Sequence, residues 1–239
     1  MAATNPGTTN LISWWSMDET SGTRNDSHGS HDLTDNNSVG YSSSGKVSNA
    51  ADFTPSDYLS IGTDESDFDF GSGNWTIGCW VKLDTDASRT IIAKTDSGYE
   101  FIIYFIGAPQ SKFSLYLVGS GETSEILPGT TWSTGTWYFL TVWYDGSKAY
   151  LQVNNGTIYD TVHTNGVKED GSKLWVGRWS SYYWDGLIDE MFVYKGKALS
   201  ADEREWLYNS GDGKSYADLT APATSIKDII GLGIVAFPR

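Results

Sequence analysis

The chain has 239 residues, a formal net charge of −14, 11 Trp and 14 Tyr. This aromatic content indicates a folded protein, because disordered chains are poor in aromatic residues, and the acidic charge argues against a nucleic-acid partner, whose phosphates require clustered Lys and Arg. The single cysteine, Cys79, excludes an intramolecular disulfide framework and a Cys-based zinc site.

The first ten residues, MAATNPGTTN, contain neither the basic region nor the apolar region of a secretory signal peptide. No apolar run in the sequence approaches the ~20 residues that a membrane-spanning helix requires. We therefore expect a protein that is made in a cytoplasm, does not insert into a membrane and leaves the cell by a route other than a signal peptide.

Short apolar runs separated by Gly, Asn, Asp and Ser predict a series of strands. The run 74–83 alternates so that one face carries Ile77, Cys79, Val81 and Leu83. Further strand-like runs cover 89–95, 99–106, 112–119, 136–156, 173–179 and 186–197. Asp145-Gly146 marks a tight turn within 136–156. Strands at this spacing, without helical periods between them, predict an antiparallel sandwich.

One short helix is predicted near the C-terminus. Ser200 and Glu203 form a capping box, and Gly211 stands at the expected C-cap. The tail that follows, 212–239, is apolar and interrupted by glycine, so it would expose a sticky surface in water. We expect it to pack on the sandwich or on a neighbouring subunit, with these assembly residues: Ile226, Ile229, Ile230, Leu232, Ile234, Val235 and Phe237.

Five segments, in this order, resemble the concanavalin A-like, laminin-G-like superfamily in its bacterial and viral branch: LISWWSMDETSGTRNDSHGSHDLT, ADFTPSDYLSI, NWTIGCWVKL, GTWYFLTVWYDGSKAYLQVNNG and YWDGLIDEMFVYKGKALSADE. The resemblance covers about residues 10–210. It implies an all-β fold, a two-sheet antiparallel jelly roll at 10–211 between an N-terminal arm at 1–9 and the tail. This fold carries lectins, adhesion domains, hydrolases and structural domains, so it does not decide the function.

The acids of the closing strand do not form a hydrolase motif. Glycoside hydrolysis needs two carboxylates, which the laminarinase-like hydrolases of this superfamily place on one strand as E-x-D-x-x-E. Here Leu187 occupies the first position, and the adjacent Asp189 and Glu190 are expected to face opposite sides of the strand. G-x-S-x-G, H-E-x-x-H and phosphate-loop motifs are absent too. We therefore predict a non-catalytic protein.

The loop NDSHGSHD at 25–32 offers closely spaced oxygen atoms, which suit a hard cation such as calcium. The resemblance implies a structural Ca²⁺ held by Asp26 and Asp189, with backbone oxygens near His28 and His31. Alternatively, Asp26 forms an Asx turn and Asp189 accepts hydrogen bonds from the N-terminal strand.

The segment RWSSYYWDGLIDE at 178–190 concentrates aromatic residues in a turn. The resemblance places Trp184 in the core. The remaining residues form either a glycan platform or a protein interface, since Tyr and Trp are enriched at both. The candidates are Arg178, Trp179, Tyr182, Tyr183 and Asp185.

These observations favour a non-catalytic structural or adhesive surface module. A bacteriophage virion protein, either a capsid decoration or a fibre, fits the missing signal peptide and the apolar tail. It would be made in the host cytoplasm and displayed on the virion surface. Its partners would be its own copies or other virion subunits, together with weakly bound cell-surface glycans. The alternatives are a free bacterial lectin, extracellular by non-classical export, and, less favoured, a polysaccharide-degrading enzyme.

Overall fold

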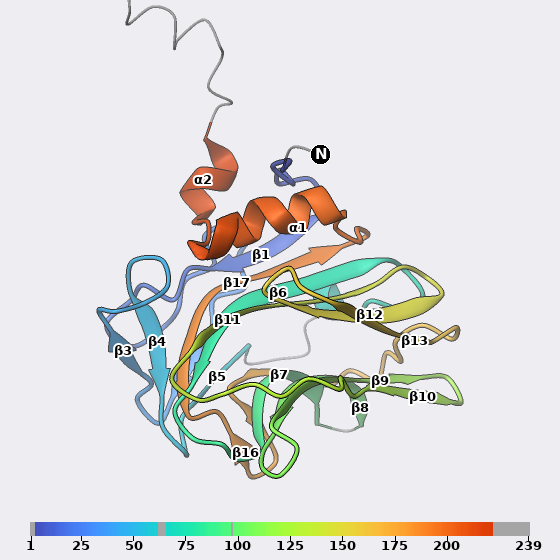
Figure 1. Cartoon of the computed structure of the whole chain (residues 1–239), viewed down its shortest axis with the longest axis horizontal. Helices are drawn as coiled ribbons and strands as arrows, with labels where there is room; N and C mark the ends of the chain where they lie inside the picture. The colour runs from blue at the N-terminus through green and yellow to red at the C-terminus, as the bar shows by residue number, and fades with distance from the viewer. Residues whose placement is uncertain (1–2, 62–65, 97, 222–239) are drawn as a thin grey trace, which may run out of the picture.

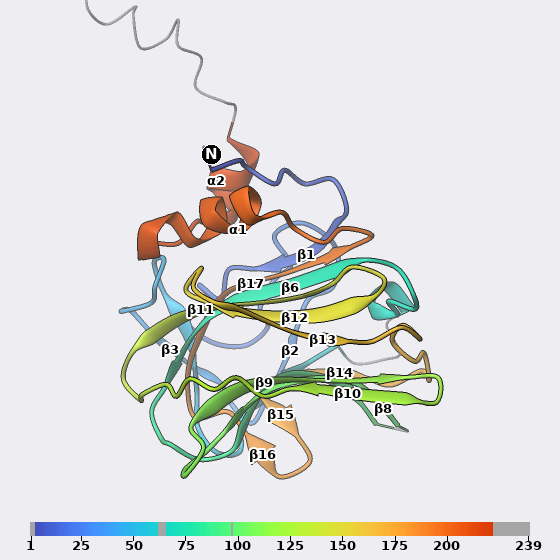
Figure 2. The ribbon, with the colours of Figure 1, turned by 45° about the vertical axis from the view of Figure 1, so that its right-hand side comes forward.

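The computed structural model describes residues 3–61, 66–96 and 98–221. Within them, two antiparallel sheets pack face to face, which confirms the predicted all-β sandwich (Figures 1 and 2). The predicted assembly residues of the tail, Ile226 to Phe237, lie outside the described residues.

The first sheet contains eight of the described strands. Along the sheet they are β13 (Ile158–Val162), β12 (Lys148–Val153), β11 (Trp137–Tyr144), β6 (Trp75–Leu83), β17 (Gly186–Lys195), β4 (Ala50–Phe53) and β3 (Gly40–Ser42), with β1 (Leu11–Trp15) paired to β17. The Asp145-Gly146 turn joins β11 to β12 as predicted, and Gly146 has a φ of 93°, which glycine adopts without strain.

The second sheet contains seven of the described strands. Along the sheet they are β10 (Glu122–Ile126), β9 (Lys112–Gly119), β8 (Tyr99–Ile106), β7 (Arg89–Thr95), β14 (Leu174–Val176), β5 (Tyr58–Ser60) and β2 (Thr34–Asn36). A separate hairpin, β15 (Arg178–Trp179) and β16 (Tyr182–Tyr183), follows β14. Figure 2 shows this hairpin on the side of the second sheet that faces away from the first sheet.

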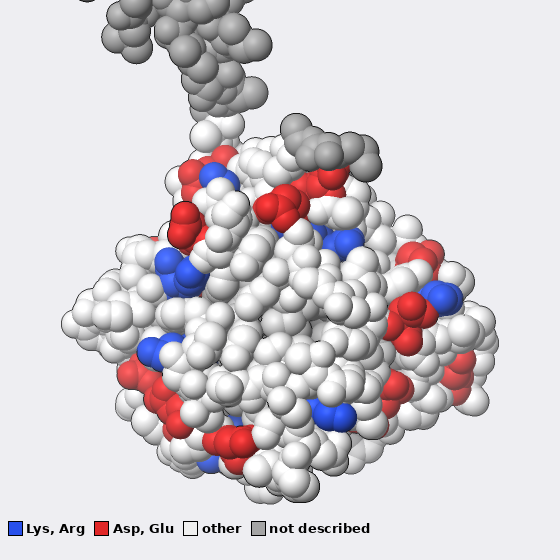
Figure 3. Space-filling view, in the orientation of Figure 1, with Lys and Arg blue, Asp and Glu red and all other residues white. Residues whose placement is uncertain are grey.

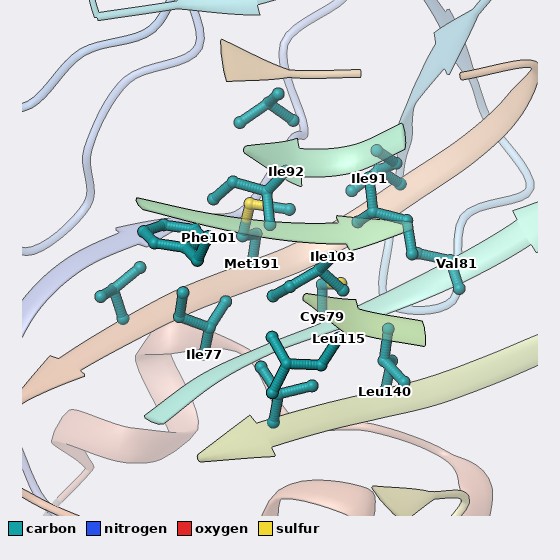
Figure 4. Packing of buried hydrophobic residues seen from close by; sticks show 14 of the residues in the cluster. Ile77, Cys79, Val81, Ile91, Ile92, Phe101, Ile103, Leu115, Leu140 and Met191 are labelled. Atoms are coloured by element: carbon teal, nitrogen blue, oxygen red, sulfur yellow. The ribbon is translucent and has the colours of Figure 1, made fainter. Parts of the chain in front are cut away.

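The main core fills the space between the two sheets. The alternation predicted in β6 is confirmed, because Ile77, Cys79 and Val81 all point into this layer (Figure 4). On the opposite side of β6, Gly78 lies under the ring of Phe192. A Cβ at Gly78 would come within 2.3 Å of that ring, so only glycine leaves room for it.

A second apolar cluster covers the outer face of the eight-stranded sheet. It joins residues of β1, β6, β11 and β17 to Leu207 of α1 (Ala201–Tyr208) and Leu219 of α2 (Tyr216–Thr220). Trp15 belongs to the main core, whereas Trp14 lies in the second cluster beside Tyr216. The adjacent tryptophans therefore occupy opposite faces of β1, as strand alternation requires.

The predicted capping box of α1 is confirmed. Ser200 accepts a hydrogen bond from the Glu203 amide, and the Glu203 carboxylate accepts one from the Ser200 amide. The expected C-cap at Gly211 is wrong, because the left-handed residue that ends α1 is Asn209, with φ 50° and ψ 51°. A 3₁₀ turn, η2 (Asn209–Gly211), follows it, and another, η1 (Ser66–Phe68), precedes β6.

The second helix, α2, falls in the segment expected to be tail. Its N-cap, Ser215, accepts from the amide of Asp218, and the Asp218 side chain accepts in return from the amide of Ser215. The sequence SYAD carries this capping signal, so the helix could have been found without the structure. No described helix has both the length and the apolar character needed to cross a membrane.

The N-terminal arm lies on the same face as the two helices (Figure 1). The Asn5 side chain donates to the carbonyl of Leu219 at 3.1 Å, and the amide of Thr4 donates to the carbonyl of Asp202 at 3.0 Å. The arm and the C-terminal helices therefore hold one another on the outer face of the eight-stranded sheet.

Candidate functional site

The aromatic hairpin β15–β16 is positioned by two residues at its base. Gly177 has a φ of 81°, and a Cβ there would come within 2.6 Å of the Phe53 ring, so glycine is required where the chain leaves β14. Trp184 is fully buried in the main core, as predicted, and its indole donates to the carbonyl of Leu187 at 3.3 Å. The hairpin is thus fixed at its base while its tip remains outside the sandwich.

The rings of the hairpin tip form a stacked pair. Trp179 and Tyr182 face each other with ring centroids 5.3 Å apart and an interplanar angle of 18°. Tyr99, at the start of β8, meets Trp179 edge-on at 5.9 Å. Trp179 is half-buried, whereas Tyr99 and Tyr182 are 47% and 43% exposed. Stacked rings in contact with solvent provide the flat apolar surface expected of a sugar platform.

Three adjoining hollows surround Trp179, and it lines all of them. The largest, of about 380 Å³, lies between Tyr99, Trp175 and Arg178. The second, of about 190 Å³, is lined by Arg89 and Tyr104 among others, and the third, of about 300 Å³, is bounded by these residues: Tyr99, Ile102, Tyr104, Tyr116 and Glu125. Trp179 therefore lies where the three hollows adjoin on the outer face of the seven-stranded sheet, and we call the three hollows together the groove.

Arg178 links the hairpin to the sheet through aromatic contacts. Its guanidinium carbon lies 4.6 Å from the ring centroid of Tyr58, 5.1 Å from that of Trp175 and 5.6 Å from that of Tyr183. Its Nε donates weakly to the carbonyl of Ser180 at 3.4 Å. Tyr183 therefore forms part of the ring cage around Arg178 rather than part of the exposed platform.

Asp185 has a structural partner. Its carboxylate accepts from the hydroxyl of Thr85 at 2.7 Å and lies 3.4 Å from the guanidinium of Arg89. The structure thus brings Arg178, Trp179 and Tyr182 together at the groove and places Asp185 beside it, in contact with Arg89.

Sequence reasoning missed the sheet residues that complete the groove, which are Tyr58, Tyr99, Tyr104, Tyr116 and Trp175. Alternation in YEFIIYFI places Phe101, Ile103 and Phe105 in the core, so Tyr104 had to face outward. Which strands lie beside the hairpin depends on pairings between distant segments, and the sequence did not reveal those.

The two acids of the closing strand lie on the covered side of the molecule. Glu190 has a φ of 46°, and the pairing of β17 with β6 is irregular between Asp189 and Phe192. The prediction that these adjacent acids face opposite sides is therefore wrong. Asp189 accepts from the amides of Lys46 and Val47 at 2.7 and 2.9 Å, and Glu190 accepts from the indole of Trp14.

Burial suppresses the ionisation of both acids. It raises the pKa of Asp189 to about 8, although the Val47 and Lys46 amides act in the opposite direction. Burial, followed by the charge of Asp189, raises the pKa of Glu190 to about 9. Neither acid lines any of the three hollows. Their contacts hold β1 and the 43–49 loop against β17, which is a structural role.

The loop at 25–32 is organised by Asp26. One carboxylate oxygen accepts from the amides of Trp14 and His28 at 2.9 and 3.0 Å, and the other accepts from the amide of His31 at 3.2 Å. Burial opposes ionisation, but the hydrogen bonds from the amides of Gly29, Trp14 and His28 and from the Ser13 side chain lower the pKa of Asp26. A Cβ at Gly29 would come within 2.8 Å of the carboxylate, so glycine lets the loop close around it.

These contacts do not fit a ready-made calcium site. Both oxygens of Asp26 face amide hydrogens, which a cation would have to displace, and the backbone oxygen of His31 accepts from the indole of Trp15 at 2.7 Å. Asp189 offers one buried oxygen without a partner. Among the described residues, no three His, Cys, Asp or Glu side chains are grouped to hold a metal ion. A structural calcium here stays a prediction.

One histidine lies between a hydroxyl and a carboxylate. His31 Nδ1 is 2.9 Å from the hydroxyl of Ser13, and its Nε2 is 3.0 Å from a carboxylate oxygen of Asp67. A nucleophile must be reachable by its substrate, yet Ser13 is fully buried and lines none of the hollows. This series of hydrogen bonds therefore ties β1 to the 3₁₀ turn η1.

The charges of the surface are mixed. In the view of Figure 3, acidic side chains are interspersed with fewer basic ones, and the described residues form no continuous basic patch on that face. The local charge of a site must therefore be judged from its immediate neighbours, since charges more than about 8 Å away are largely screened at physiological salt.

Several solved structures have a fold similar to that of this chain. Domain 4 of AbnA, an extracellular arabinanase from Geobacillus stearothermophilus solved with arabinotriose, is 18% identical with a TM-score of 0.67, covering 86% of this chain and 98% of its own. A Trypanosoma rangeli sialidase is 12% identical with a TM-score of 0.63, covering 90% of this chain and 35% of its own. A botulinum neurotoxin type C structure is 12% identical with a TM-score of 0.60, and the match covers 85% of this chain and 51% of the toxin chain.

The chain thus spans nearly all of the arabinanase domain but about a third of the sialidase and half of the toxin chain. No curated protein matches its sequence. The family model described as the concanavalin A-like lectin/glucanases superfamily matches residues 53–203, which is more than half of the chain. The chain therefore belongs to the concanavalin A-like lectin/glucanases superfamily.

Proposed function

We propose that this protein is a non-catalytic carbohydrate-binding module that holds its ligand in the groove around Trp179. The observation that carries the proposal is that three hollows meet at one tryptophan, whose ring is stacked and partly open to solvent. An aromatic ring offers a flat face to the C–H surface of a sugar, and polar groups at its edge bind the hydroxyls.

The polar groups around the groove suit this role. Arg178, Thr95 and Asp96 line the largest hollow, Arg89 lines the second, and Glu125 lines the third. Together they provide donors and acceptors on different sides of Trp179, as oriented binding of a polyhydroxylated ligand requires.

Two structural neighbours support a glycan ligand. The arabinanase domain was solved in complex with arabinotriose, and botulinum neurotoxin type C depends on interaction with two ganglioside molecules to enter cells. At 18% and 12% identity these similarities define the fold, so the ligand of this chain is argued from its own groove.

The binding test compares two matched tyrosines. Tyr99 lines two of the hollows, whereas Tyr41 on β3 lines none of them, and each is 47% exposed. We expect Tyr99→Ala to weaken glycan binding at least tenfold in array and calorimetric measurements, and Tyr41→Ala to leave it unchanged. Trp179→Ala should abolish it. Equal binding by the wild type and both groove variants, or no binding to any glycan, would reject the proposal.

The finer assignment is a bacteriophage surface protein, either a capsid decoration or a fibre. The observation that favours it is the placement of the first and last described segments: the arm and α2 lie together on one side, and the β15–β16 hairpin, whose Trp179 lines the three hollows, lies on the opposite side (Figure 2). A module attached through its ends would present the groove outward. Its partners would be copies of itself or other virion subunits.

This assignment is tested by the mass in solution. We expect the full chain to self-associate in light-scattering chromatography, and a variant ending at Ala221, which keeps α2, to be monomeric and to bind glycan unchanged. A monomeric full chain would instead favour the free lectin.

A further inference from the structure

Arg178 is a groove cation whose contacts are almost all with ring faces. Three aromatic rings surround its guanidinium, and the one side-chain hydrogen bond that it makes to a described residue is the weak contact with the carbonyl of Ser180. Within the described residues, no carboxylate lies within ion-pair distance of it. Arg89, in the adjoining hollow, differs in this respect because it is paired with Asp185 at 3.4 Å.

Within the described residues, the Nη atoms of Arg178 donate no hydrogen bond, because only its Nε donates, to the carbonyl of Ser180. Aromatic rings interact with the flat face of a guanidinium, whereas its five N–H donors point outward in the plane. The cage also restricts the side chain before any ligand arrives, so less conformational entropy is lost on binding. A planar guanidinium held in this way is suited to bidentate recognition of a carboxylate.

The acid that shares the largest hollow is partly neutralised. Asp96 lines it together with Arg178, and the ammonium of Lys173 lies 3.6 Å from the Asp96 carboxylate. Lys173 also lies over the Trp175 ring at 5.9 Å, next to Arg178. The hollow is therefore lined by Arg178 and Asp96 with Lys173 beside them, and the Lys168–Asp170 ion pair, 3.2 Å apart, adjoins Gly98 of its lining. Despite the net charge of −14 of the whole chain, the acids near Arg178 each have a lysine partner.

We infer that the groove selects sugars that carry a carboxylate, with the sugar acid group on Arg178 and a sugar ring against Trp179. This inference rests on the proposed glycan-binding function and names its ligand class. The shared chemistry is that of uronic and sialic acids. Both present a planar carboxylate directly on the pyranose ring, so that carboxylate and ring face can be bound together.

The test uses a ligand pair that differs only in charge. Calorimetry compares an oligogalacturonate with its methyl ester, and 3′-sialyllactose with its own methyl ester provides the second source of a sugar carboxylate. We expect the wild type to bind an acid at least tenfold more tightly than its neutral partner. A gain confined to one pair identifies the class of acid. The preference should decrease as NaCl is raised, because a charged contact is screened by salt.

The variant series assigns the preference to Arg178. Arg178→Gln should reduce the ratio of acid to neutral binding to about one while neutral binding persists, and Arg178→Lys should give an intermediate ratio, since a lysine cannot form the bidentate contact. A control outside the groove, Lys148→Gln on β12, where the ammonium pairs with Asp160 at 2.7 Å, should keep the full preference.

The outcomes separate the two proposals. If the wild type binds acidic and neutral sugars equally, the inference fails while the glycan-binding function stands. If it binds neither kind, the proposed function fails as well. If Arg178→Gln does not fold, the two ligand pairs on the wild type still decide whether the groove prefers acids. An unchanged preference in folded Arg178→Gln would overturn the assignment to this residue.

Discussion

The two outer faces of the sandwich are both rich in aromatic residues, yet the described part of the chain leaves only one of them open. On the eight-stranded sheet, Trp14, Trp80 and Phe192 are at most 2% exposed, because α1, α2 and the N-terminal arm cover them. On the seven-stranded sheet, the small β15–β16 hairpin leaves Tyr99 and Tyr182 nearly half exposed. Among the described residues, an aromatic face of the sandwich thus stays accessible to solvent only where no other element covers it.

The largest expected effect is a difference in the free energy of unfolding between substitutions on the covered face and on the open face. Phe192→Ala removes a ring that is 1% exposed and stacks on Trp14 at 5.2 Å, so we expect a loss of about 3–5 kcal/mol in the free energy of unfolding. Tyr182→Ala on the open face should cost no more than about 1 kcal/mol. Urea denaturation followed by tryptophan fluorescence measures both. Equal losses would mean that the hairpin is as integral to the fold as the covered face.

A smaller effect concerns the helix that covers the first face. Ser200→Ala removes the N-cap of α1 and should cost about 1 kcal/mol in the same denaturation experiment. Ser181, an exposed serine at the tip of the open-face hairpin, provides the matched control, and Ser181→Ala should change stability by less than about 0.5 kcal/mol. A cap substitution without effect would show that α1 is held by its apolar contacts alone.

The rim of the covered face should show a modest dependence on pH. Although partial burial opposes ionisation, the Tyr150 hydroxyl, the Lys148 amide and Ser147 lower the pKa of Asp145 to about 2. Because this is below the value of about 4 in an unfolded chain, the contribution is present above pH 4 and is lost as the pH falls toward 2. The stability of the wild type should therefore fall more steeply over this range than that of Asp145→Asn. Parallel acid titration curves would contradict this.

The smallest expected effect is that of calcium. The Asp26 loop lies beside α2, where Nδ1 of His28 is 3.1 Å from the Tyr216 hydroxyl. Both oxygens of the Asp26 carboxylate already accept hydrogen bonds from backbone amides. Adding EDTA or Ca²⁺ should therefore change the melting temperature by less than about 1 °C. A rise of several degrees with Ca²⁺, lost in Asp26→Asn, would show that the loop opens to take the ion.

Much of the sandwich followed from local patterns. Alternation oriented Ile77, Cys79 and Val81 toward the core, and the Asp145-Gly146 pair located a hairpin. Both signals act over a few residues, where the side-chain period or a turn conformation leaves little choice.

The site was only half predictable, because its other half comes from distant strands. The hairpin residues Trp179 and Tyr182 were visible as a cluster, but Tyr99 and Trp175 join them only through the order of strands in the second sheet. The irregular pairing of β17 at Glu190 could not be predicted from the sequence either. It depends on the left-handed backbone of Glu190, which the regular alternation of a strand does not indicate.

The hydrogen bond between Asn5 and Leu219 has a consequence for protein engineering. Two segments that are 214 positions apart in sequence meet at 3.1 Å, so the intervening fold begins and ends at almost one point in space. Domain insertion and circular permutation are tolerated best when termini are this close. The sandwich could therefore be inserted into a surface loop of an unrelated host protein through two short linkers. The two ends of the interrupted host loop would need to move apart only slightly.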